Sequence, residues 1–362
     1  MKLTEMAEKS LVRARRDAER FGIETLFLNA PMPQAAGIDM VAAVSEAGGL
    51  GVLPAAFLSG EEIVRAVAAV RKRTAKPFAI NLAIRPRRYS NEKAAQTLWN
   101  GLSALLEELG LPTRADAYDL TGAKVMPDFG EQFEAMLSVK PHAAIATFGG
   151  FREPEADALK ANGILNFGTA TTLKEAKVLR SAEVDALIIQ GAAAGGVRAS
   201  FESADSVLDD TAGLVEEAVR ATGLPVIASG GIAGATSAAA AFLAGASGVM
   251  IGTALLTTNE SLLKDQARSA WHWAGAADLV MTRVFSGRLE RVLRSPMTEA
   301  LETYEACVPP WPAPLALFKP IWSKAEALGR DELAVLPLGQ AVGRSAWMRV
   351  SEAYDAVASL LR

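Results

Sequence analysis

The segment from residue 224 to residue 253 limits the possible folds more than any other part of the chain. A short apolar run, Val226 to Ala228, ends at the turn Ser229-Gly230-Gly231. After a stretch of small residues, a second apolar run begins at Gly248 and ends at the turn Gly252-Thr253. Apolar runs this short, bounded by turn residues, indicate buried strands. Two such strands with a helix between them indicate a parallel α/β sheet.

The two glycine turns also predict a binding site. In a (β/α)8 barrel, the turns after strands 7 and 8 are a frequent phosphate site. Glycine allows close approach of the backbone, and the N-terminus of the following helix favours an anion. Ordinary turns are the alternative, but two glycine turns after two successive buried strands favour the phosphate end of a cofactor or substrate site.

The rest of the chain repeats the alternation of strand and helix. Eight apolar runs read as strands of an α/β fold, a (β/α)8 TIM barrel over residues 1–258. An amphipathic helix with a solvated Arg/Glu-rich face is expected over residues 1–24. Residues 85–141 exceed an ordinary strand-to-helix connection and predict an insertion over the barrel mouth. Residues 259–362 predict a mostly helical C-terminal extension or lid. The expected strands are 26–30, 50–53, 77–83, 143–149, 164–168, 186–190, 226–228 and 248–251.

Composition excludes several classes of protein. The 362 residues are 50% hydrophobic and 22% charged, which is typical of a folded chain with a large core. The net charge of -4, without a dense basic run, argues against nucleic acid as a partner. A secretory signal and a membrane-spanning stretch are both absent from the sequence, so a cytoplasmic protein is expected. The single cysteine, Cys307, excludes an internal disulfide, and the strand ends offer no clustered metal ligands.

Several short motifs follow one another along the chain, most of them at the ends of the expected strands. They are Ala30-Pro31-Met32, Ile80-Asn81-Leu82, Thr147-Phe148-Gly149, Gly191 to Gly196, Ala228 to Ile232, Ile251-Gly252-Thr253, Ser286-Gly287-Arg288 and Gly339-Gln340. In their joint order and spacing these motifs resemble those of the nitronate monooxygenases, and the resemblance extends over about residues 25–345. This family, formerly called 2-nitropropane dioxygenases, consists of FMN-dependent (β/α)8 barrels related to flavin enoyl-thioester reductases.

The resemblance implies an FMN-binding flavoprotein with its cofactor contacts at these motifs. The flavin ring is expected near the first two motifs and the paired glycines, and the phosphate against the turns at 229–231 and 252–253. The residues expected to bind FMN are Ala30, Pro31, Met32, Asn81, Gln190, Gly195, Gly196, Ser229, Gly230, Gly231, Gly252, Thr253 and Gln340.

One position departs from the family pattern. The paired glycines Gly195-Gly196 are normally followed by a histidine that acts as the catalytic base, and this chain has Val197 there. Because valine cannot accept a proton, the catalytic residue stays unknown. Arg198 and Phe148 are candidate substrate contacts, with Arg198 equally compatible with a surface role.

The two histidines and three acidic residues are the candidates for a substitute base. His142 precedes the fourth strand, at the barrel end opposite the expected site. His272 lies between two tryptophans, where packing is the simpler interpretation. Asp205, Asp209 and Asp210 follow the sixth strand, where capping of the next helix is the simpler interpretation.

Three functions remain open at this point. The first is an oxidoreductase, a monooxygenase that oxidises a nitronate or a similar small anion with O2. The second is an FMN-dependent reductase or oxidase of another substrate, such as an enoyl thioester with NAD(P)H. The third is a flavin-binding protein with little catalysis. Five of the six tryptophans lie beyond residue 270, and this apolar tail allows a homodimer interface.

Overall fold

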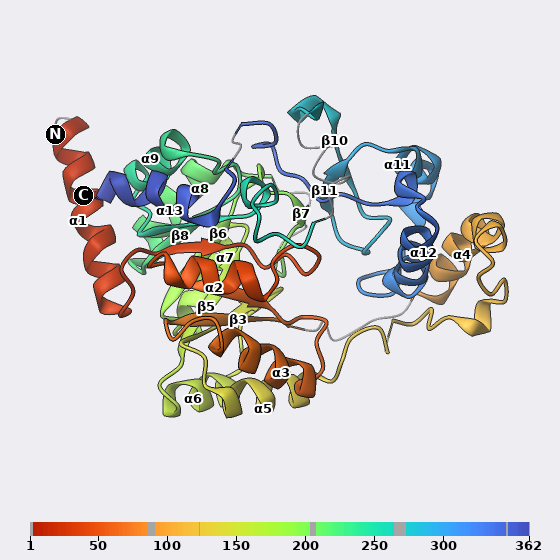
Figure 1. The fold of residues 1–362 in the computed structure, drawn as a ribbon, viewed down its shortest axis with the longest axis horizontal. Helices are drawn as coiled ribbons and strands as arrows, with labels where there is room; N and C mark the ends of the chain where they lie inside the picture. Colours follow the sequence, from red (N-terminus) through yellow and green to blue (C-terminus); the bar gives the residue numbers. More distant parts are fainter. Residues whose placement is uncertain are drawn as a thin grey trace.

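Eight parallel strands form the centre of the molecule (Figure 1). The computed structural model describes residues 3–84, 91–122, 124–202, 208–263, 273–344 and 347–361, with the side chains of residues 3–7 left out. Neighbouring strands follow the order β1-β9-β8-β6-β5-β4-β3-β2, and all their pairings are parallel. The expected (β/α)8 barrel is therefore confirmed. Its strands are β1 (Phe27–Asn29), β2 (Gly51–Pro54), β3 (Phe78–Ala83), β4 (Ala143–Thr147), β5 (Leu165–Ala170), β6 (Ala186–Gln190), β8 (Val226–Ser229) and β9 (Gly248–Ile251).

A side chain helps to close the barrel between β1 and β2. Leu50 N donates to Phe27 O at 2.9 Å, which joins the two strands at one point. Beyond it, the buried Asn29 amide exchanges two hydrogen bonds with the backbone of Val52. Asn29 Nδ2 donates to Val52 O at 2.9 Å, and Val52 N donates to Asn29 Oδ1 at 2.8 Å. The Asn29 side chain therefore takes the place of a backbone ladder at this seam.

Helices cover the outside of the barrel. The strands are buried on both faces, with one apolar cluster inside the barrel and two more between the strands and the helices. This explains why the strands read as continuous apolar runs in the sequence. The covering helices are α2 (Ile38–Glu46), α3 (Gly60–Arg71), α5 (Phe129–Val139), α6 (Glu153–Ala161), α7 (Leu173–Ser181), α8 (Thr211–Thr222), α9 (Ala235–Leu243) and α13 (Val350–Ala358).

The last of these helices comes from the end of the chain. Helix α13 packs between α2 and α9, in the position of the eighth helix of the barrel (Figure 1). The Tyr354 ring meets the Phe27 ring edge-on at 5.6 Å between centroids, and Tyr354 Oη donates to Thr25 Oγ1 at 3.3 Å. The chain therefore leaves the barrel after β9 and returns to it. On this packing we propose that the non-barrel lobe ends before α13, instead of extending to residue 362.

The non-barrel lobe combines two segments that are far apart in the sequence. In Figure 1, α4 lies beside α11 and α12, away from the barrel helices. Leu98, Leu102 and Leu106, spaced along one face of α4, pack in one apolar cluster with Phe285 and Phe318. A small antiparallel sheet in the order β10-β11-β7 connects this lobe to the barrel loop after β6. The elements are α4 (Glu92–Glu108), β7 (Gly196–Val197), β10 (Leu279–Thr282), β11 (Glu290–Leu293), α11 (Pro296–Leu301) and α12 (Leu315–Leu328).

Within the segment that the sequence marks as an insertion, α4 and α5 have different roles. Helix α4 belongs to the lobe, whereas α5 packs against α3 as an ordinary barrel helix. Short 3-10 helices complete the structure: Ala115–Ala117, Thr253–Leu255, Ala276–Asp278, Glu302–Cys307, Asp331–Leu333 and Ser359–Leu361. Across the described ranges, no helix has the length and apolar character of a membrane span.

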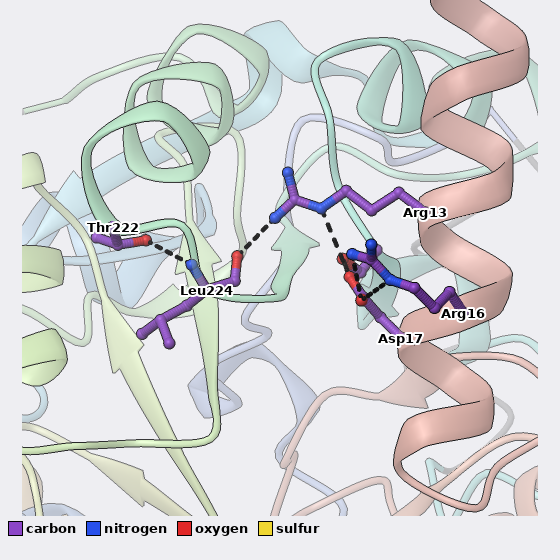
Figure 2. A network of polar contacts seen from close by, with 6 residues as sticks. Arg13, Arg16, Asp17, Thr222 and Leu224 are labelled. Carbon is purple, nitrogen blue, oxygen red and sulfur yellow. Dashed lines mark hydrogen bonds and ion pairs between the residues drawn. The ribbon is translucent and has the colours of Figure 1, made fainter.

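Helix α1 (Leu3–Arg20) covers the barrel end at which the strands begin. Figure 2 shows Arg13 and Arg16 converging on Asp17, with Arg13 Nη2 also donating to Leu224 O at 2.8 Å. Ser247 Oγ donates to Asp17 Oδ2 at 2.6 Å, and Asp17 is only 3% exposed. Leu224 and Ser247 precede β8 and β9. Asp17 therefore anchors α1 to the base of the barrel, whereas Arg15, Arg16, Glu19 and Arg20 are exposed, as expected for the Arg/Glu-rich face.

Candidate active site

A cavity of about 450 Å³ lies at the carboxyl ends of the barrel strands. The structure brings together there nearly all the residues that the sequence marks as site residues. Arg198 and Gln340 are the two that are not among the described lining residues. The expected residues that line the cavity are Ala30, Pro31, Met32, Asn81, Phe148, Gln190, Gly195, Gly196, Val197, Ser229, Gly230, Gly231, Gly252 and Thr253.

The turn after β8 forms one wall of the cavity. Gly230 and Gly231 have φ angles of 102° and 78°, which L side chains rarely adopt. A Cβ on Gly230 would lie 2.9 Å from Ala194 N, and one on Gly231 would lie 2.9 Å from the Ala193 Cβ. Within the described chain, the backbone N–H groups of Gly230, Gly231 and Ile232 donate to no protein acceptor. Successive unpartnered N–H groups of this kind form a concave site for an anion.

The N-terminus of α9 contributes less to this wall than the sequence suggests. The helix begins only at Ala235, and Ser237 Oγ accepts hydrogen bonds from Ala233 N at 3.0 Å and Gly234 N at 3.2 Å. Two of the amides at the helix start are therefore already bonded within the protein. The donors available to an anion come from the turn itself.

The segment before α13 packs directly on the glycine-rich loop after β6. Gly339 N donates to Thr253 Oγ1 at 2.9 Å, and Gln340 N donates to Ala193 O at 2.9 Å. A Cβ on Gly195 would lie 2.5 Å from Gly339 N, so only glycine fits at that position. The Gln340 side chain is exposed. Gln340 therefore contributes to this contact through its backbone. The segment at 339–340 and the loop after β6 together close one end of the cavity.

Two amide side chains at the strand ends are held by the protein itself. Asn81 Nδ2 donates to Thr147 Oγ1 at 2.8 Å and to Ile145 O at 3.2 Å. Gln190 Nε2 donates to Val197 O at 3.2 Å, and Ala199 N donates to Gln190 Oε1 at 2.9 Å. Gln190 therefore fixes the loop that carries Val197, in addition to lining the cavity.

Aromatic side chains, among them Phe148 and Trp311, also line the cavity. Phe148 adopts a left-handed conformation, with φ at 68°, which is uncommon for a bulky residue and occurs often at functional sites. Its ring lies 5.0 Å from the Trp311 ring between centroids, and the Arg288 guanidinium carbon lies 4.0 Å above the Phe148 ring. Arg288 Nη1 also donates to Ser200 O at 2.7 Å. The guanidinium therefore holds Phe148 in place through a cation–π contact.

Arg198 has a different position from the one expected of a substrate contact. Its side chain is buried, with Nη2 donating to Thr171 O at 3.1 Å and Nη1 near Gln190 O at 3.5 Å. Thr171 directly follows β5, and Gln190 is the last residue of β6. Arg198 therefore ties the loop after β6 to the barrel rim.

The lobe contributes two charged residues that sequence reasoning missed. Glu290 lines the cavity and is 5% exposed, and Ser286 Oγ donates to its Oε1 at 2.6 Å. Burial raises the pKa of Glu290 to about 7; the hydrogen bonds from Ser286 oppose this rise, and the negative charge of Glu305 adds to it. Lys319 of α12 also lines the cavity, with its Nζ 4.0 Å from the centroid of the Phe57 ring. Burial lowers the pKa of Lys319.

The histidines give the cavity no base within the described residues. His142 lies just before β4, at the far end of the barrel, and its Nε2 is 2.6 Å from Phe21 O. His272 and Asp205 lie outside the described residues. Asp210 caps α8 by accepting from Gly213 N at 2.9 Å, which agrees with the expected capping role. Val197 lines the cavity where the family pattern places a histidine.

A barrel with its cavity at the carboxyl ends of the strands, between two glycine turns, has the architecture of a TIM-barrel enzyme. The family model described as nitronate monooxygenase matches residues 16–361. The chain belongs to the nitronate monooxygenase family, and it is an oxidoreductase of this flavin-dependent family.

Individual relatives agree with this assignment. A probable nitronate monooxygenase of Staphylococcus aureus is 30% identical over 89% of this chain and 90% of its own length. One of Staphylococcus haemolyticus is 28% identical over 93% of this chain and 94% of its own length. The nitroalkane oxidase of Streptomyces ansochromogenes has a similar structure, with a TM-score of 0.85, 25% identity and coverage of 94% and 96% of the two chains. FabK of Thermotoga maritima, at 23% identity and a TM-score of 0.68, shares the fold.

Proposed function

We propose that this chain is an FMN-dependent oxidoreductase that oxidises a nitronate, or a similarly small anion, with O2. The observation that carries the proposal is the turn at 229–232. Its three unpartnered N–H groups and its two positive-φ glycines form a cradle that fits the phosphate of FMN. Family membership supports the same cofactor class.

The residues around the cradle suit the rest of the cofactor. Gly252 and Thr253 extend the phosphate site along the adjacent strand end, next to the turn after β8. Pro31, Met32 and Asn81 line the cavity at the ends of β1 and β3, where a flat ring could rest against them. The mostly apolar lining is typical of a site in which the cofactor supplies the reactivity and the protein supplies orientation and electrostatics.

The remaining wall suits a small anionic substrate. When bound, FMN would supply the acceptor for the electrons of the substrate and their donor to O2. Lys319 brings a positive charge to the cavity, which favours an anion. Phe148, Trp311 and Trp322 provide apolar surface that excludes water around that anion. A nitronate is already deprotonated, so the absence of histidine at Val197 does not prevent its oxidation.

An anaerobic absorption spectrum tests the proposal directly. The purified protein, reconstituted with FMN, is recorded before and after addition of ethyl nitronate. Flavin bands that bleach or shift support nitronate oxidation. Bands that stay unchanged contradict it, and NADPH with a crotonyl thioester is then the next pair to test. Flavin that neither pair reduces would indicate a flavin-binding protein with little catalysis, and no retained flavin would contradict the cofactor itself.

A further inference from the structure

We infer that the Glu290 carboxylate takes the α-carbon proton of a neutral nitroalkane, so that the enzyme forms its own nitronate inside the cavity. The inference rests on the proposed function and extends its substrate class from nitronates to nitroalkanes. It assigns to a residue of β11 the proton transfer that Val197 cannot perform.

The register of the small sheet brings Glu290 to the right position. Strands β7 and β11 are antiparallel, with Val197 directly opposite Glu290 and Gly196 opposite Arg291. Arg198 N donates to Leu289 O at 2.8 Å beside this pair. Residues opposite each other in such a pair point to the same face, with Cβ atoms about 5 Å apart. Both Val197 and Glu290 line the cavity, so the carboxylate emerges next to the position at which the family pattern has its histidine.

The surroundings of Glu290 suit a base that works near neutral pH. Burial raises the pKa of this carboxyl to about 7, close to the value at which a general base is most effective. Ser286 Oγ occupies one lone-pair position of Oε1 and orients the carboxyl group. A carboxylate has about four such positions, so others stay available for a proton.

The charged groups around Glu290 come from several elements. Glu305, in the 3-10 helix Glu302–Cys307, raises the pKa of Glu290 through its negative charge and accepts from Thr282 Oγ1 at 2.8 Å. Lys319 of α12 lines the same cavity. Three arginines near Glu290 in the sequence or the sheet donate hydrogen bonds to backbone carbonyls. Arg198 donates to Thr171 O, Arg288 to Ser200 O and Arg291 to Ala192 O.

The proposed step is a proton transfer with no change of oxidation state. The α C–H bond of the nitroalkane breaks, and an O–H bond forms on Glu290. The electron pair of the C–H bond stays on the substrate as a nitronate, so the negative charge moves from Glu290 to the nitro oxygens. Lys319 lines the cavity, and its ammonium group would attract that anion. The step needs no oxidant, and the proton returns to solvent when Glu290 ionises again.

Deuterium exchange measures this step without oxidation of the substrate. The FMN-reconstituted protein is mixed anaerobically with nitroethane in D2O, and loss of the α-proton NMR signal is followed against a buffer blank. For the native chain we expect exchange whose rate rises through about neutral pD. Glu290→Gln keeps the size of the side chain and removes the base, so exchange should fall at least about 100-fold. The rate of ethyl nitronate oxidation should change far less, so that the loss of exchange exceeds the loss of oxidation by about 100-fold.

Two further variants separate a base from a structural role. Glu305→Gln removes the neighbouring charge, so the midpoint of the pD profile should move to lower pD while exchange persists. Val197→His in the Glu290→Gln background should restore exchange. Glu290→Asp has a side chain one methylene shorter, so exchange should be slower but should still depend on pD. This variant replaces Glu290→Gln as the test if Glu290→Gln fails to fold.

The outcomes distinguish this inference from the proposed function. Exchange in Glu290→Gln within about threefold of the native rate, or native exchange no faster than the blank, overturns the role of Glu290. Exchange that depends on Glu290 in a protein that cannot oxidise ethyl nitronate upholds the inference and overturns the proposed oxidation. If the protein oxidises ethyl nitronate but does not catalyse exchange of nitroethane, the inference about Glu290 is overturned and the proposed oxidation is upheld.

Discussion

Val197 and Glu290 face each other across two antiparallel strands and line the same cavity, although one belongs to a barrel loop and the other to the lobe. Among the described lining residues, those of the barrel include no acidic or basic side chain. The lobe adds a carboxyl group, a lysine and the tryptophans Trp311 and Trp322. Proton chemistry at this site depends on how the lobe is attached to the barrel.

Burial of Glu290 makes the stability of the protein depend on pH. Its pKa is about 7 in the folded chain and 4.5 in the reference state, so the folded chain binds the proton more tightly. The stabilisation from the neutral carboxyl is fully present below about pH 4.5 and is lost as the pH rises through about 7. This difference between the two pKa values corresponds to about 3 kcal/mol of unfolding free energy.

Glu290→Gln should remove this dependence. Compared with the native chain, the variant should gain about 3 kcal/mol of unfolding free energy at pH 8 and little at pH 4.5, as measured by urea denaturation. Exposed Glu299→Gln is the matched control and should show no such pH-dependent gain. Equal effects of pH on the native chain and on Glu290→Gln would mean that Glu290 titrates normally.

Gly231→Ala should weaken FMN binding. The new Cβ would lie 2.9 Å from the Cβ of Ala193, and the φ angle of 78° disfavours any side chain. We expect the Kd for FMN to rise at least about tenfold, which corresponds to about 1.4 kcal/mol. Quenching of FMN fluorescence during titration of the apoprotein measures this Kd.

Gly234→Ala provides the control for that experiment. Nothing lies within 4 Å of a Cβ at Gly234, and its φ angle of 173° is extended backbone. Its FMN affinity should stay within about threefold of that of the native chain. If both variants bind FMN as the native chain does, the turn at 229–232 is not the phosphate site.

Local sequence signals predicted the barrel and most of the cavity. Each strand has its own apolar run, and the turn glycines follow the strand ends directly, so neighbouring residues carry the information. Helix α13 was not recognised as a barrel helix because the lobe separates it from β9. Glu290 was missed because its place beside Val197 depends on a pairing between distant segments. The local signal for Glu290 is weak, because it lies among other charged residues, Arg288 and Arg291, four positions after Ser286.

Two expected site residues have other positions for a similar reason. Arg198 and Gln340 are adjacent in sequence to residues that do contact or approach the cavity. Which way a loop side chain points depends on acceptors supplied by other elements, such as Thr171 O for Arg198. No spacing rule within the loop contains that information.

Asn29→Ala should destabilise the barrel at its seam. The substitution leaves Val52 N and Val52 O without the partners that they have in the native chain, and both groups are buried. Each unsatisfied buried group costs about 1–3 kcal/mol, so we expect the two together to lower the unfolding free energy by about 2–6 kcal/mol. Urea denaturation measures this loss. The exposed Asn100→Ala, on α4, is the control and should change stability by less than about 0.5 kcal/mol.

Lys319→Met should weaken binding of an anionic substrate. Lys319 lines the cavity, and its ammonium form brings a positive charge there; burial lowers its pKa. Methionine keeps the apolar stem and removes the charge. If Lys319 holds the nitronate equally in the ground and transition states, KM for ethyl nitronate should rise about tenfold with little change in kcat.

Steady-state oxygen consumption at several nitronate concentrations separates KM from kcat in that variant. The surface residue Lys177, exposed on α7, supplies the control, because Lys177→Met removes the same charge far from the cavity lining. A parallel rise of KM in both variants would point to a general loss of electrostatic attraction. A fall in kcat with an unchanged KM would instead show that Lys319 acts only once charge moves during the reaction, and the ground-state role would be wrong.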